Sequence, residues 1–459
     1  MTFDRVTRVL AAFGLASALF LPVAAGREMG DELLMWTARH SAELVCAWAA
    51  IALLSLWALR RLAQTDDVRS RLMGLALLGV LPGLSVVAVT GRAIRDAIGG
   101  FPAWVPLTGT AVVLAVLIAG AFARPRLLAS GLLRVFACGC TLVFPLVSFG
   151  LKTEAVRAGA PAPAVQAGEG CRDLFVLLFD ELSYTSAFDS GRAVWPHLAR
   201  LAAEGDVYHR ASSPAAARRG SDANTLDALS AYLGSTPHGE VRAEDASIFG
   251  VARRTGLHAD VSGWYFPYCK ALDGFAERCR DHSFYNASPV EGPFNPVAPL
   301  LSAINIWPFQ LPTGLLKRPV ATWLHRRTLQ RLVREASEPP VAHPAFRWVH
   351  FNVPHFPWLY DTGPLRLGAF TPTPNRYARQ VEEADRALGT VLQSLDARQE
   401  YGQATIVVVA DHASRNGLAD DQRHVPLVVR RPGASRRDHW EPVDVADILT
   451  SLPAMACGR

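Results

Sequence analysis

Hydrophobic residues are arranged differently in the two parts of the chain. Residues 1–150 hold long apolar stretches with charges confined to short intervals, whereas residues 171–459 mix apolar, aromatic and charged side chains as soluble domains do. A helix of about 20 apolar residues crosses a bilayer core of about 30 Å. We therefore predict a bundle of about five transmembrane helices, at residues 9–26, 42–59, 72–91, 103–123 and 127–150.

The first stretch has a second interpretation. Arg5 and Arg8 precede it and the small residues Ala24 and Ala25 close it, which is also the pattern of a secretory signal peptide. Its removal would leave four spans, and the C-terminal part would stay on the same side of the membrane.

Arginines between the spans predict the orientation. The loops on the side of the N-terminus hold Arg5, Arg8, Arg60, Arg61, Arg69, Arg71, Arg124 and Arg126, and the loops on the other side hold Arg27, Arg39, Arg92 and Arg95. Because loops rich in basic residues stay in the cytoplasm, everything after Gly150 is expected outside it. Residues 151–170, rich in Ala, Gly and Pro, are interpreted as a linker to an extracytoplasmic domain at 171–459.

Two short apolar runs of this outer domain end in acidic residues. Residues 173–180 end in Asp180, and residues 405–410 lead into Asp411 and His412. Such runs are typical of strands buried in a parallel sheet, and ligands bind at the carboxyl ends of those strands. With a helix expected at 195–205, the pattern predicts an α/β domain with a mostly parallel central sheet.

Asp180, Asp411 and His412 are therefore expected to meet at one edge of the sheet. Two carboxylates and an imidazole suit Zn²⁺ or Mn²⁺ better than a thiolate-seeking metal, which predicts a site for one divalent ion. Taken singly, Asp180 can instead cap the following helix, and Asp411 with His412 can form a strand-end turn.

The charge distribution and the cysteines bear on the possible binding partners and on the compartment. The net charge is +5, but no run of Lys and Arg is longer than a pair, so nucleic-acid binding is not supported. Cys269 and Cys279 stand ten positions apart and can clip a short loop in an oxidising compartment; the alternative is two unrelated buried thiols.

The order of the motifs resembles the alkaline phosphatase and sulfatase superfamily. The motifs are Leu-Leu-Phe-Asp180-Glu-Leu, Trp195-Pro-His-Leu-Ala-Arg-Leu-Ala-Ala-Glu-Gly205, Val-Val-Ala-Asp411-His412, His424-Val-Pro-Leu-Val-Val429 and Val443-Asp-Val-Ala-Asp-Ile-Leu449. With its N-terminal spans the chain is similar to the membrane-bound sulfatase-like group that includes lipoteichoic acid synthases and phosphoethanolamine transferases. The resemblance implies a multi-pass protein of the bacterial inner (plasma) membrane.

The resemblance also implies a nucleophile at a helix start, and Thr225 fits the threonine version, in which the hydroxyl binds the metal, loses its proton and attacks phosphorus. Ser221 and Ser212 are alternatives, and Thr225 can also be a simple helix cap. Sulfatases of the usual kind need Cys or Ser within C/S-x-P-x-R, and Ser212-Ser-Pro-Ala-Ala216 lacks the arginine. A usual arylsulfatase is therefore disfavoured.

His355 and His424 match the two histidines of the superfamily that bind the phosphate of the substrate or protonate its leaving group. A histidine does either near neutral pH. His350 and His343 lie nearby and are interpreted as structural. One departure follows His412, where Ala413-Ser414 replaces the usual Gly-Glu.

The predicted function is a metal-dependent transferase that moves a phosphoethanolamine- or phosphoglycerol-like group from a membrane lipid to an envelope glycan or lipid through a Thr-linked intermediate. One alternative is a phosphodiesterase or sulfoesterase with water as acceptor. Another is a catalytically degenerate membrane protein that binds an envelope glycan.

Overall fold

The computed structural model describes most of the C-terminal domain and the first two helices. The described residues are 5–28, 38–67, 70, 73–75, 78, 170–189, 195–215, 225–234, 247–283, 287, 293–306, 314–355, 358, 373–415 and 421–458. The predicted spans at 103–123 and 127–150, most of the span at 72–91, and Ser221 lie outside them. The chain divides into two compact units, Met1–Ala155 with Tyr285–Val320, and Val156–Phe284 with Ala321–Arg459.

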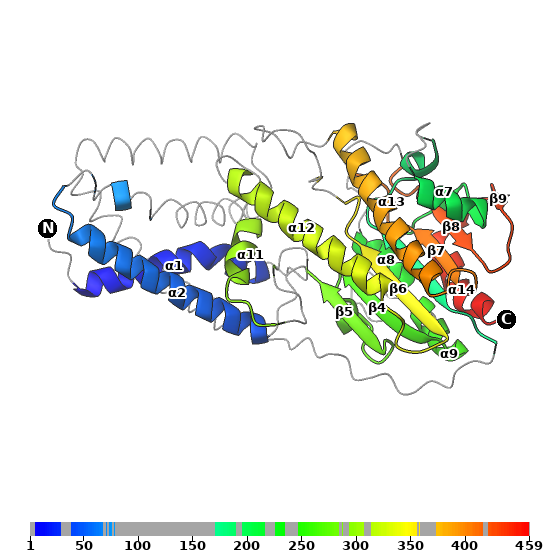
Figure 1. Ribbon diagram of the computed structural model, residues 1–459, viewed down its shortest axis with the longest axis horizontal. Coiled ribbons are helices and arrows are strands. Elements are labelled where there is room, and N and C mark those ends of the chain that lie inside the picture. Colours follow the sequence, from blue (N-terminus) through cyan, green and yellow to red (C-terminus); the bar gives the residue numbers. More distant parts are fainter. Residues whose placement is uncertain are drawn as a thin grey trace. The chain divides into compact units, whose positions relative to one another are not determined.

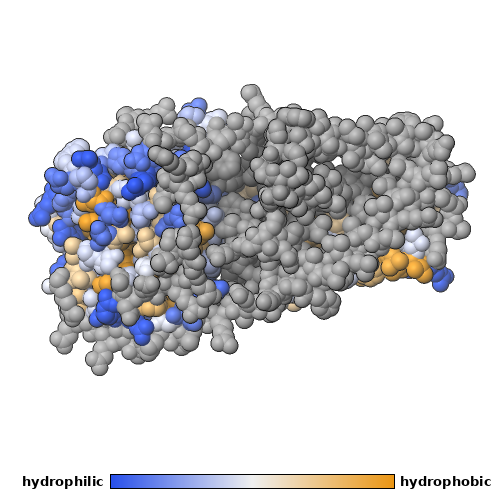
Figure 2. Space-filling view, turned by 180° about the vertical axis from the view of Figure 1, so that it is seen from behind, coloured by the Kyte–Doolittle hydropathy of each residue, from blue (hydrophilic) through white to orange (hydrophobic). Residues whose placement is uncertain are grey.

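Two long helices, α1 (Arg5–Glu28) and α2 (Ala38–Ala63), pack on each other in the first unit. Their contact includes a hydrogen bond of 3.1 Å from Trp48 Nε1 to Ser17 Oγ. Among the described helices, one segment, Arg39–Ala63, is long and apolar enough to cross a membrane. Four of its large apolar side chains are exposed, those of Val45, Leu53, Leu54 and Trp57. Figure 2 shows hydrophobic surface on the described part of the first unit. The five-span bundle stays a prediction.

Helix α11 (Ala298–Ile306), from the C-terminal part of the sequence, also belongs to the first unit and packs against α1 and α2. Ala303 is fully buried beside Phe20 and Leu44. The backbone N–H of Asn295 donates a hydrogen bond of 2.9 Å to Oε1 of Glu43. Residues 171–459 therefore do not form one uninterrupted unit, a division that the sequence pattern did not indicate.

An eight-stranded sheet forms the core of the second unit, in the order β5-β4-β6-β1-β7-β8-β2-β9 (Figure 1). The strands are β1 (Leu174–Phe179), β2 (Asp206–Tyr208), β4 (His258–Trp264), β5 (Arg278–His282), β6 (Ala345–Phe351), β7 (Thr405–Val409), β8 (Leu427–Arg430) and β9 (Arg437–His439). Strand β8 pairs antiparallel with both of its neighbours, and the other pairs are parallel. The predicted mostly parallel sheet is confirmed.

Helices pack in two groups around this sheet. Helix α7 packs on α13, which crosses the sheet in Figure 1, and α8 and α9 pack on α14. The helices of the second unit are α7 (Pro196–Ala203), α8 (Thr225–Tyr232), α9 (Ile248–Thr255), α10 (Tyr268–Ala271), α12 (Gly314–Ser337, which begins in the first unit), α13 (Pro374–Ala397) and α14 (Val445–Ala456), with a π-helical turn η3 (Thr185–Asp189). A small second sheet pairs β3 (Ala211–Ser212) with β10 (Val443–Asp444).

Two disulfides stabilise the second unit. Cys269 is joined to Cys279, the pair that the sequence spacing allows. Cys171 is joined to Cys457. The two cysteines lie 286 positions apart, so no local pattern in the sequence predicts this pair. The second bond closes the domain at its two ends. Disulfides of this kind persist in oxidising compartments.

Candidate metal and nucleophile site

The register of the central strands brings Asp180 and Asp411 together. In the pairing of β1 with β7, Leu178 lies opposite Val409, so the residues two positions further on, Asp180 and Asp411, are level beyond the strand ends. Side chains two positions apart point to the same face of a sheet. Both carboxylates therefore leave the sheet on one side.

Asp180, Asp411 and His412 form a compact buried group, in which one ligand atom from each residue lies within 4.8 Å of the others. All three side chains are fully buried. Both carboxylate oxygens of Asp180 and Oδ2 of Asp411 lack a hydrogen-bond partner among the described residues. Burial and the charge of Asp411 raise the pKa of Asp180 well above its ordinary value of 3.8. Such a site favours binding of a proton or a cation.

The turn after β1 is held in an unusual conformation. Glu181 has φ of 64°, the left-handed region that residues with side chains seldom adopt. Its backbone N–H donates a hydrogen bond of 3.1 Å to Oδ1 of Asp411, and its carbonyl oxygen accepts one of 2.7 Å from the hydroxyl of Tyr377. These contacts fix Asp180 and Asp411 relative to each other.

Thr225 lies at this group. It begins α8, its side chain is buried, and its Oγ1 is 3.1 Å from Nε2 of His412. Nδ1 of His412 donates a hydrogen bond of 2.8 Å to the carbonyl oxygen of Ala413, so Nε2 presents its lone pair to the site. Ser212, the alternative nucleophile that the structure describes, lies in β3 and pairs with β10. The geometry therefore favours Thr225 over Ser212.

His355 is linked to the acidic turn through Arg415. The guanidinium donates a hydrogen bond of 2.9 Å to Nε2 of His355 and contacts Oε1 of Glu181 at 2.6 Å. Burial, followed by the charge of Arg415, lowers the pKa of His355 well below its ordinary value of 6.5. His355 is therefore neutral at pH 7, with its proton on Nδ1.

His424 has other partners. Its Nε2 donates a hydrogen bond of 3.0 Å to the carbonyl oxygen of His209, and its ring stacks on Tyr184 with centroids 4.2 Å apart. Among the described residues no contact of His424 with Asp180, Asp411 or His412 is found. The structure brings His355, and not His424, into the network around Glu181, so a catalytic role for His424 stays a prediction.

Sequence reasoning did not assign three residues of this neighbourhood to the site. Arg415 follows the unusual Ala413-Ser414 pair and carried no motif signal. His350 was interpreted as structural, yet its Nε2 lies 3.3 Å from Oδ2 of Asp180. Tyr268 hydrogen-bonds Nδ1 of His350 at 3.0 Å. The position of His350 in the strand before His355 was the available signal for it.

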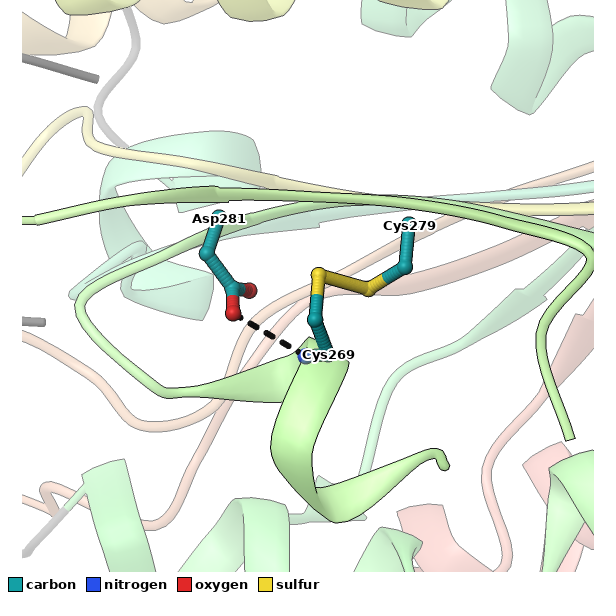
Figure 3. A group of neighbouring side chains, drawn as sticks. All are labelled: Cys269, Cys279 and Asp281. Carbon is teal, nitrogen blue, oxygen red and sulfur yellow. Dashed lines mark hydrogen bonds between the residues drawn. A yellow bond between two sulfur atoms is a disulfide. The ribbon is translucent and has the colours of Figure 1, made fainter. Parts of the chain in front are cut away.

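A second group of metal-binding residue types contains Cys269, Cys279 and Asp281. Figure 3 shows that the two sulfur atoms are bonded to each other and that Asp281 faces the start of α10. Oδ2 of Asp281 accepts a hydrogen bond of 3.0 Å from the backbone N–H of Cys269. Because the thiols are consumed in the disulfide, this group is a structural clip.

Comparison with known protein families identifies the family of this domain. The family model described as Sulfatase matches residues 172–458. The chain belongs to the Sulfatase family. No curated protein matches the chain. Its relation to lipoteichoic acid synthases and phosphoethanolamine transferases stays a prediction.

Solved structures similar to this chain include three with low sequence identity. A 2-O GAG sulfatase has 15% identity and a TM-score of 0.43, covering 62% of this chain and 70% of its own. A phosphonate monoester hydrolase of Agrobacterium radiobacter has 16% identity and a TM-score of 0.41, covering 62% and 73%. An alkaline phosphatase superfamily protein from Vibrio parahaemolyticus has 15% identity and a TM-score of 0.41, covering 65% and 70%.

Proposed function

We propose that this protein is a membrane-anchored, metal-dependent enzyme that uses Thr225 to take a phospho-substituent from a lipid and passes it to an envelope glycan or lipid. The observation that carries the proposal is the hydroxyl of Thr225, 3.1 Å from Nε2 of His412 beside two buried carboxylates. The apolar segment Arg39–Ala63 and the two disulfides support an anchor and an outer compartment.

The residues present fit one divalent cation. Asp180, Asp411 and His412 offer two carboxylates and an imidazole, with Thr225 as the fourth ligand, a set that suits Zn²⁺ or Mn²⁺. Carboxylate oxygens that are buried without hydrogen bonds are costly unless a cation or a proton compensates them. When bound, such an ion lowers the pKa of an alcohol and stabilises negative charge on a phosphoryl oxygen.

The proposed transfer takes place in two steps. Oγ1 of Thr225 loses its proton and forms a bond to phosphorus, the bond from phosphorus to the lipid alcohol breaks, and the leaving lipid oxygen takes up the proton that Thr225 lost. The hydroxyl of the acceptor then loses its proton to a base and attacks phosphorus, the bond from phosphorus to Oγ1 of Thr225 breaks, and Oγ1 takes that proton back.

Neutral His355 is the candidate base for the second step. Its Nε2 can take a proton only after Arg415 transfers its hydrogen bond to another acceptor, such as a phosphate oxygen of the substrate. Arginine binds phosphate oxygens well because its N–H groups form a planar fork. Substrate binding would thereby activate His355.

Water is the second candidate acceptor, because the chain belongs to the Sulfatase family. Hydrolysis uses the same first step and ends with the group on water. Incubation with vesicles of phosphatidylethanolamine and phosphatidylglycerol, with and without an added glycan, separates the two. A modified glycan supports transfer, whereas the free phospho-alcohol in both samples supports hydrolysis.

The test of Thr225 uses Thr225→Ala, with Thr450→Ala in α14 as the matched control. Thr450 is also a helical threonine, whose hydroxyl donates to the carbonyl oxygen of Ala446. We expect Thr225→Ala to lose turnover by at least about 1000-fold and to lose the phospho-adduct that mass spectrometry detects on the wild type. Unaltered turnover in Thr225→Ala would falsify the assignment.

A further inference from the structure

His350 occupies a position in the sheet that directs it toward the same cation site. It lies in β6 opposite Leu178 of β1, and Asp180 follows Leu178 by two residues. Because side chains alternate along a strand, His350 and Asp180 leave the sheet on the same face. Nε2 of His350 lies 3.3 Å from Oδ2 of Asp180, and both side chains are fully buried.

The hydrogen bonds of His350 leave Nε2 facing the carboxylate. Nδ1 lies 3.0 Å from the hydroxyl of Tyr268. A neutral imidazole carries one proton, and on Nδ1 that proton has a hydrogen-bond partner. Nε2 has no hydrogen-bond partner among the described residues. A lone pair of Nε2 thus faces an oxygen atom of Asp180 that also lacks a partner.

Two lone-pair atoms at this separation repel each other unless a proton or a cation lies between them. His412 shows the same arrangement, with Nδ1 donating to a carbonyl oxygen and Nε2 turned to the acidic group. Histidines that bind metals usually donate their second ring N–H to an oxygen in this way. In both imidazoles Nδ1 therefore lies at hydrogen-bond distance from an oxygen atom and Nε2 faces the acidic group.

We infer that His350 is a ligand of the divalent ion together with Asp180, Asp411, His412 and Thr225, and that Tyr268 is the positioning residue that orients it. This inference rests on the proposed metal site. It adds a second imidazole to that site, which favours Zn²⁺ and other nitrogen-seeking ions over Mg²⁺ or Ca²⁺.

The first test requires no substitution. The full-length protein in detergent is loaded with Mn²⁺ after incorporation of ¹⁵N-histidine, and electron spin echo measurements count the imidazole nitrogens coupled to the ion. Two coupled imidazoles are expected, one from His412 and one from His350. A single coupled imidazole, with Mn²⁺ bound, would overturn the assignment of His350 and leave the proposed function intact. Failure of the wild type to bind any ion would overturn both.

The second test compares variants by titration with Zn²⁺. His350→Gln is expected to weaken binding by more than about 100-fold, and Tyr268→Phe by about 10-fold. The matched control is His325→Gln, because His325 is also a buried histidine whose ring lies against Trp264, 6.4 Å between centroids. Its affinity should change by less than about twofold. Equal affinities of His350→Gln and the wild type would overturn the inference.

Discussion

Arg415 donates a hydrogen bond of 2.9 Å from its guanidinium to Nε2 of His355. The same side chain contacts Oε1 of Glu181 at 2.6 Å, so one cation connects the acidic turn after β1 to the loop after β6. Glu181 and His355 are 234 and 60 positions from Arg415 in the sequence. The arginine therefore sets the proton position on His355, and under the proposed function its positive charge is available to an anionic substrate.

Replacement of Arg415 should reduce activity strongly. Arg415→Ala removes the charge and both hydrogen bonds, and we expect kcat/KM to fall by about 100-fold. Arg415→Lys keeps the charge without the planar fork and should recover part of the loss. Steady-state kinetics measures both. The control is Arg436→Ala, since Arg436 pairs with Asp438 at the surface, and an equal loss in this control would contradict a specific role.

The buried pair of Glu335 and His282 predicts a pH dependence of stability. Nε2 of His282 lies 2.9 Å from Oε2 of Glu335. Burial opposes ionisation, yet the hydrogen bond and charge of His282 lower the pKa of Glu335 below its ordinary value of 4.5. A carboxyl whose pKa is lower in the folded state stabilises the fold above the unfolded pKa, and this contribution disappears as pH falls through the folded pKa.

Glu335→Gln should therefore destabilise the protein by about 2 kcal/mol at pH 7. The difference from wild type should shrink below pH 4.5, where the wild-type carboxyl begins to protonate. Thermal unfolding of the full chain at pH 7 and at acidic pH measures it. Glu338→Gln is the control, because Glu338 pairs with Arg280 at a more exposed site. A difference that grows toward acidic pH would show that the sign is wrong.

The disulfide between Cys171 and Cys457 should stabilise the second unit more than the one between Cys269 and Cys279. A cross-link removes more conformational entropy from the unfolded chain when its loop is longer, and the separations are 286 and 10. The entropy model gives on the order of 5 against 3 kcal/mol. Two double Cys→Ser variants, one for each disulfide, are compared with the wild type by thermal unfolding to show which bond stabilises more. The control is Cys46→Ser, at the unpaired cysteine of α2, which should leave the unfolding temperature unchanged.

Helix α11 should depend on its contact with α1 and α2. Ala303 is fully buried there, so Ala303→Leu overpacks the contact and should cost about 2 kcal/mol. Limited proteolysis of the detergent-solubilised protein should then cut near residues 293–306 more rapidly. Val297 is 55% exposed and Val297→Ala provides the control. Similar cleavage rates for Ala303→Leu and the control would contradict the packing.

The sheet and its acidic end were predictable because the signals are local. The apolar runs of β1 and β7 stop at Asp180 and Asp411, and a parallel sheet brings such ends together. Thr225 was reached through the order of motifs, and the structure places it beside His412. These features depend on patterns of a few residues or on a resemblance over the whole domain.

The rest depends on contacts between distant segments. Arg415 and Glu181 are 234 positions apart, and Cys171 and Cys457 are 286 apart; no local pattern identifies either pair. Nothing in the local sequence distinguishes His350 from other histidines, because its place beside Asp180 follows from the register of β6 against β1. For His424 the opposite holds. Its motif matches the superfamily, but in the structure it has no contact with the acidic group among the described residues.

The first unit is built from two separate parts of the sequence, residues 1–155 and 285–320. This affects how a water-soluble form of the protein should be made. A protein shortened to begin at residue 156 would retain α11 but lose both helices that cover Ala303. The uncovered apolar surface would promote self-association of the truncated protein. Excision of the outer domain therefore requires two changes, removal of residues 1–155 and replacement of residues 285–320 by a short polar linker.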